Sequence, residues 1–120
     1  MPTNLNSWTV LASTLRNLSQ LIPGQSDPSD EADLYYRRAC LAAAEERFDV
    51  ALVFCTKAIA VAPRHLPARL LLAKIHDKCL GNLEAAVAGY KKVIALAGYD
   101  GNNAHCLAAR EALDALVTRS

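Results

Sequence analysis

Length, composition and charge narrow the classes of protein to which this chain can belong. Its 120 residues suffice for one modest hydrophobic core, not for two. Thirteen Lys plus Arg and twelve Asp plus Glu give a formal net charge of +1, which disfavours nucleic acid and anionic membranes as partners. The hydrophobic share is 52% but includes only one Trp, four Tyr and two Phe, a composition that favours an all-α fold.

Neither a leader nor a membrane anchor is indicated by the sequence. Met1 is not followed by the basic segment and apolar run of a secretory signal, and no stretch approaches the ~18 apolar residues of a membrane span. We therefore expect a cytoplasmic protein without a membrane span.

The cysteines form no CxxC pair, so neither a zinc ribbon nor a redox motif is indicated; they are Cys40, Cys55, Cys79 and Cys106.

The first helix is expected over residues 7–22. Its apolar residues recur at spacings of three and four, which places them on one narrow stripe: Trp8, Leu11, Leu15, Leu18 and Ile22. Pro23 and Gly24 end this helix. We interpret residues 1–24 as an amphipathic capping helix and residues 25–31, rich in Ser, Asp and Pro, as a linker.

Five further helices are predicted by capping residues and breakers. The second opens at Ser29 or Asp30 and continues to about residue 46, and the third is closed by Pro63. The fourth has Pro67 in its first turn and Gly81 just past its end. In chain order these five helices are expected near residues 30–46, 49–62, 66–80, 83–97 and 103–118.

Small residues recur at a repeat spacing. Ala39 and Ala73 lie 34 residues apart, and Ala73 and Ala108 lie 35 apart. Together with Phe48, Ala51, Ala58 and Pro63 in the first unit and GNLEAAVAGYKKVIAL in the second, this pattern resembles the tetratricopeptide repeat. The resemblance covers residues 32–117 and implies about two and a half helix-turn-helix repeats, in a domain spanning 32–120 whose last helix is a cap.

The repeat register makes two structural predictions. Ala39, Ala73 and Ala86 should be buried where helices cross, because helix axes approach closely only past small side chains. One residue more than the repeat requires lies between Ala73 and Ala86, and we expect it near Cys79 and Leu80.

The resemblance also implies a function and a site. In the family the first helix of each repeat lines a concave groove that binds a peptide or helix of another protein. We therefore expect a protein-binding adaptor, scaffold or assembly chaperone, with no cofactor and no catalytic residue. The residues that correspond to the groove are Tyr36, Cys40, Leu70, Leu71, Lys74, Asp77, His105, Cys106 and Ala109.

Two alternatives remain open at the level of sequence. The stripe of the first helix could join a second copy of the chain and make a structural homo-oligomer. The pairs His76 with Cys79 and His105 with Cys106 could serve a metal- or thiol-dependent enzyme, but their irregular spacing makes this a weak signal.

Overall fold

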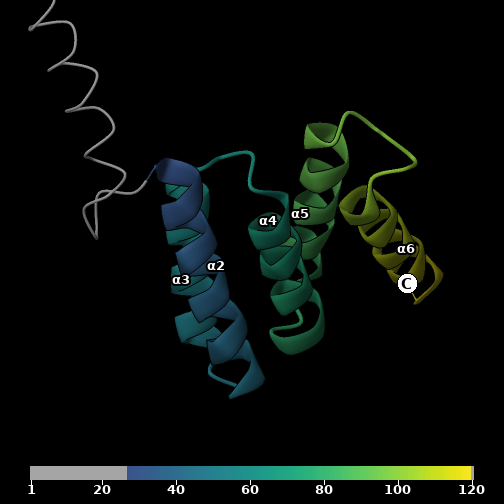
Figure 1. Cartoon of the computed structure of the whole chain (residues 1–120). Helices are drawn as coiled ribbons and strands as arrows, with labels where there is room; N and C mark the ends of the chain where they lie inside the picture. The colour runs from purple at the N-terminus through teal and green to yellow at the C-terminus, as the bar shows by residue number, and fades with distance from the viewer. Residues whose placement is uncertain (1–26, 120) are drawn as a thin grey trace, which may run out of the picture.

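The computed structural model describes residues 27–119, and every regular element among them is helical (Figure 1). The all-α prediction is therefore confirmed. The helix expected within 1–24 lies outside the described residues. None of the described helices is both long enough and apolar enough to cross a membrane. In chain order the elements are α2 (Pro28–Ala44), α3 (Phe48–Val61), α4 (Leu66–Lys74), the π-helix η1 (Ile75–Cys79), α5 (Leu83–Leu96) and α6 (Ala104–Arg119).

Helix α2 begins earlier than its capping residues suggested. The side chain of Asp27 accepts a hydrogen bond from the Ser29 N–H at 2.8 Å, and Pro28 occupies the first helical position. Proline suits this position because its missing N–H has no partner there in any helix. The helix thus starts inside the segment expected to be a linker, four positions before residue 32.

Successive helices stand side by side in the order of the chain (Figure 1). Helix α2 packs on α3, α3 on α4, α4 on α5, and α5 on α6. Contacts also join α2 to α4 and α4 to α6. The apolar core is accordingly divided into three clusters between neighbouring helices, and α2, α4 and α6 are placed next to one another.

The helices cross at small residues. Ala39, Ala73 and Ala86 are all completely buried, which confirms that prediction. Helices α4 and α5 also approach closely at Gly89, which the sequence analysis did not single out. A Cβ atom added to Gly89 would lie 2.8 Å from the Cβ of Ala73, so α4 and α5 can pack this closely only with glycine here.

A π turn lies between Ala73 and Ala86, where one residue more than the repeat spacing was expected. The Leu80 N–H donates to the carbonyl oxygen of Ile75, five residues back, at 3.0 Å. A π turn contains one residue more than an α turn allows, so η1 contains one additional residue just before the predicted position. Gly81 then ends the element with φ of +65°, a left-handed conformation that glycine adopts without strain.

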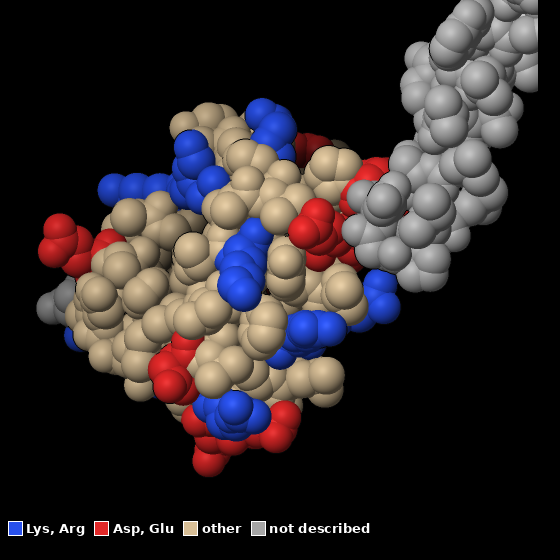
Figure 2. Space-filling view, turned by 90° about the vertical axis from the view of Figure 1, so that its left-hand side faces the viewer, with Lys and Arg blue, Asp and Glu red and all other residues tan. Residues whose placement is uncertain are grey.

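Charge is distributed evenly over the end of the molecule formed by α2 and α3. Figure 2 looks onto this end and shows Lys and Arg interspersed with Asp and Glu among uncharged side chains. This face therefore presents no extended field of one sign.

Candidate functional site

Side chains from three separate helices line one hollow in the surface. It has a volume of about 100 Å³, and we call it the three-helix hollow. Its lining consists of Tyr36 from α2, Pro67, Leu70, Leu71 and Lys74 from α4, and His105 from α6. Five of these six residues were among the predicted groove residues, and Pro67 was not.

Helix geometry explains why α4 contributes most of the lining. Leu70 and Leu71 lie three and four residues after Pro67, and Lys74 lies four and three residues after them, so these side chains share one face of the helix. Contacts of α4 with α2 and with α6 then bring a wall to either side of this face. Residues as far apart in the chain as 36 and 105 meet for this reason.

The hollow combines an apolar base with a polar edge. Leu70 is 8% exposed and belongs to the core between α4, α5 and α6, whereas Leu71 is half-buried against the core between α2 and α3. Lys74 is exposed, and in residues 27–119 its ammonium group has no ion-pair partner. The site can therefore receive an apolar group beside a negative or polar one.

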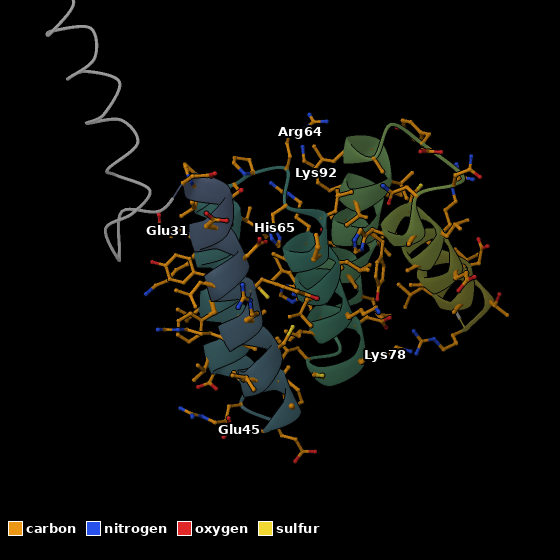
Figure 3. The ribbon with its side chains drawn as sticks, in the orientation of Figure 1. Glu31, Glu45, Arg64, His65, Lys78 and Lys92 are labelled. Atoms are coloured by element: carbon orange, nitrogen blue, oxygen red, sulfur yellow. The ribbon has the colours of Figure 1, made fainter. Side chains whose placement is uncertain are left out.

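His65 fixes the Tyr36 wall in place, and Figure 3 shows it between α2 and α4. Its Nδ1 accepts a hydrogen bond from the Ala68 N–H at 3.1 Å and so caps α4. Because Nδ1 accepts, the neutral ring carries its proton on Nε2, which lies 2.7 Å from the Asp33 carboxylate. The ring centroids of His65 and Tyr36 are 5.5 Å apart. Sequence reasoning missed this residue, although Pro67, two positions after it, marked the first turn of the helix and so indicated a cap nearby.

The Tyr36 hydroxyl is neutral in the physiological range. Burial, and then a hydrogen bond with the Cys40 side chain, raise the pKa of Tyr36 to about 12. Cys40 is half-buried and stands one turn along α2 without lining the hollow. On α3, burial and then the neighbouring Cys40 raise the pKa of the Cys55 thiol to about 12. A nucleophilic cysteine needs a lowered pKa, so the raised pKa of Cys55 indicates a packing role for this thiol.

Three predicted groove residues belong to the interior, and their assignment to the groove was wrong. Cys106 and Ala109 are completely buried because they lie on the face of α6 that packs in the cluster with α4 and α5. The side chain of Asp77 is 1% exposed. It accepts hydrogen bonds from the Tyr90 hydroxyl at 3.0 Å and from Nη2 of Arg119 at 2.8 Å.

The buried Asp77 carboxylate is stabilised in its charged form. Burial alone would raise its pKa, but the hydrogen bonds from Arg119 and Tyr90 outweigh this effect, and the pKa of Asp77 is lowered. The same burial, together with the Asp77 charge, raises the pKa of Tyr90. This set of residues joins η1, α5 and the end of α6; its carboxylate is closed to solvent, whereas the Arg119 side chain is 54% exposed.

The part of the chain that the structure describes contains no group of three metal-ligating side chains. His76 and Cys79 lie on η1, where Cys79 is exposed and the buried Nδ1 of His76 has no hydrogen-bond partner among the described residues.

Comparison with known proteins returns no relative. No protein-family model, no curated protein and no solved structure matches this chain.

Proposed function

We propose that this chain is a protein-interaction module whose three-helix hollow holds an apolar side chain from a peptide or helical segment of another protein. The observation that carries the proposal is the convergence of Tyr36, Leu71 and His105, from three segments of the chain, on one accessible hollow. Half-buried apolar and aromatic side chains next to an exposed cation are typical of such anchoring sites.

Likeness to a short tetratricopeptide array supports this proposal. The support comes from the order in which the helices pack, from buried Ala39, Ala73 and Ala86, and from contacts among α2, α4 and α6. In such an array the partner lies along the first helix of each repeat. An adaptor or an assembly chaperone in the cytoplasm would use the surface in this way, and the four free cysteines suit a reducing compartment.

The size of the hollow favours an anchored segment over a small-molecule substrate. Pockets for drug-sized ligands are roughly 300–1,000 Å³ and enclose most of the ligand. The three-helix hollow is about 100 Å³, which suits one aliphatic or aromatic side chain, with the remainder of the partner lying on the surface around it.

Peptides selected by display on the intact protein test this proposal. The binding of a selected peptide should perturb the NMR signals of Tyr36, Leu71 and His105 more than those of α3 and α5. Tyr36→Ala should weaken its binding because it removes an aromatic side chain that lines the three-helix hollow. Lys74→Glu should weaken it because it reverses the charge at the edge of the hollow.

Exposed positions outside the hollow supply matched controls. Tyr99→Ala and Lys92→Glu make the same chemical changes at exposed sites on the α5–α6 connection and on α5, and they should leave the affinity unchanged. Circular dichroism confirms that each variant is folded. Equal losses in both pairs of variants, or perturbed signals confined to α3 and α5, would show that partners bind elsewhere.

A further inference from the structure

His65 makes one contact through each of its two ring nitrogens, and the two contacts lie on different helices. Its Nδ1 accepts from the Ala68 N–H in the first turn of α4, and its Nε2 lies 2.7 Å from the Asp33 carboxylate on α2. The His65 side chain is only 9% exposed. The ring therefore links the start of α4 to α2, and the Tyr36 ring packs beside it with the centroids 5.5 Å apart.

Only the neutral His65 ring can make both contacts. One nitrogen of a neutral imidazole donates and the other accepts, whereas both nitrogens of the imidazolium carry a proton and donate. A proton on Nδ1 would face the Ala68 N–H, a second donor, across 3.1 Å. Turning the ring over does not restore the bond, because a carbon atom then takes the place of Nδ1. Protonation of His65 is thus incompatible with the observed cap of α4.

The Ala68 N–H depends on this one acceptor. It belongs to the first turn of α4, where an N–H group has no carbonyl partner within the helix. Ala68 is completely buried, so water does not replace a lost acceptor. A donor left unsatisfied in the interior is costly, and an imidazolium held in the same enclosed place adds the cost of a buried charge. Both costs favour movement of the protonated ring away from α4.

The Asp33 carboxylate acts in the opposite direction, and its effect is weaker. An imidazolium would make a charge-assisted hydrogen bond to this carboxylate. The Asp33 side chain is 52% exposed, however, so solvent screens the attraction. The same exposure allows the bond to persist when the ring swings outward, so the bond does not hold the ring against Ala68.

The other ionisable groups on the elements around His65 do not compete for its proton. Tyr36 on α2 stays neutral because its pKa is raised to about 12. Arg64 in the α3–α4 connection and Arg69 on α4 donate to backbone carbonyl oxygens of α5 and of that connection. His105, from α6, is the other histidine of the three-helix hollow, and it lines the hollow directly. A test must therefore separate the two histidines.

We propose that His65 is a pH-dependent latch between α2 and α4, whose protonation releases the Tyr36 wall and so weakens binding at the three-helix hollow. The proposal rests on the proposed function, because it describes the regulation of that same hollow. When the ring leaves Ala68, α4 loses the cap of the turn that contains Pro67, and Tyr36 loses its neighbouring ring. Two of the lining side chains are thereby released together.

NMR of the intact protein tests the latch without a ligand. At about pH 7.5 the nitrogen-15 shifts of His65 should show an unprotonated Nδ1 and a protonated Nε2. Towards about pH 5.5, across the range in which histidine gains its proton, Nδ1 should become protonated. In the same step the Ala68 amide should lose its hydrogen-bonded shift and exchange faster with water, and the ring signals of Tyr36 should move.

Either of two NMR results would overturn the latch. One is an Nδ1 of His65 that stays unprotonated down to about pH 5.5. The other is an Ala68 amide signal that does not change while Nδ1 gains its proton.

The affinity of a display-selected peptide with blocked ends and no ionisable side chain gives the second measurement. In the wild type the affinity should fall several-fold over the same pH range. His65→Asn should remove this fall, because asparagine caps a helix without titrating. His105→Asn takes away the other histidine and should keep the fall. Circular dichroism at both ends of the range confirms that each protein is folded.

The outcomes separate the latch from the proposed function. A wild-type affinity that does not change with pH would overturn the latch, as would a fall that His105→Asn abolishes and His65→Asn retains. If no selected peptide perturbs the signals of Tyr36, Leu71 and His105, the proposed function fails. The pH response of the Ala68 amide then still decides whether His65 latches α4 to α2.

Discussion

The two polar regions of this small fold have opposite properties. Around Asp77, a carboxylate with a side chain 1% exposed accepts hydrogen bonds from two partners and is closed to solvent. At the three-helix hollow, Lys74 is exposed and Tyr36 and His105 are half-buried around an apolar base. Satisfied and inaccessible polar groups hold the helices together, whereas accessible ones next to apolar side chains can recognise a partner. Changes in the first region should therefore affect stability, and changes in the second should affect binding.

Removal of the buried carboxylate should have the largest effect on stability. Asp77→Ala leaves the Tyr90 hydroxyl buried without its acceptor, and we expect a loss of about 2–3 kcal/mol in the free energy of unfolding. Urea denaturation measures this loss. Asp114→Ala removes an exposed carboxylate of α6 and should change stability by less than about 0.5 kcal/mol. Equal losses of stability in Asp77→Ala and Asp114→Ala would show that the buried carboxylate stabilises the fold no more than an exposed one.

Gly89→Ala should have the next largest effect. The new methyl group would lie 2.8 Å from the Cβ of Ala73, which cannot move aside. Overpacking costs about 1–3 kcal/mol and the better helix propensity of alanine returns up to about 1 kcal/mol, so a net loss of about 1–2 kcal/mol is expected in thermal or urea unfolding. Gly101→Ala places a methyl group where no atom lies within 4 Å and should be nearly neutral. A neutral Gly89→Ala would contradict the close approach of α4 and α5.

The pH dependence of stability should carry the signature of Asp77. Its pKa is lowered in the folded protein, so its stabilisation is complete above the unfolded value of about 4 and is lost as the pH falls through the folded value. Wild-type stability should therefore fall more steeply than that of Asp77→Asn below about pH 4. The free energy of unfolding of both proteins, measured with urea from pH 6 to pH 3, gives the comparison. Parallel curves of this free energy against pH would show that the folded protein does not favour the charged form of Asp77.

Substitution at the edge of the hollow should have the smallest effect on stability. Lys74→Ala removes an exposed side chain from α4 and should change the free energy of unfolding by less than about 0.5 kcal/mol. A loss comparable to that of Asp77→Ala in the same urea titration would mean that Lys74 is structural, and that the comparison between the two regions fails there.

The predictions from sequence succeeded where local spacing determines structure. The alanine spacings identified Ala39, Ala73 and Ala86 as buried positions, and the extra residue before Ala86 indicated an irregularity where the structure has η1. Gly81 correctly indicated where η1 ends, because the left-handed backbone conformation at that position favours glycine and depends only on local structure.

Burial of individual groove residues could not be predicted in the same way. Asp77 was assigned to the groove by its correspondence with the tetratricopeptide repeat, but the wider π turn changes the helical spacing after Lys74. Its partners Tyr90 and Arg119 lie 13 and 42 residues further along the chain, so no local pattern connects them. Cys106 and Ala109 follow His105 on α6, and which of these residues faces the core depends on how α6 rotates against α5.

Photo-crosslinking from position 74 tests the central claim, that the three-helix hollow is where a partner binds. A photoreactive amino acid replaces Lys74 in one sample and Lys92, an exposed lysine of α5, in the other. In extract from cells that express the protein, the account predicts a discrete crosslinked species from position 74, suppressed by a display-selected peptide, and none from position 92. The same species in equal yield from both positions, unaffected by the peptide, would contradict it.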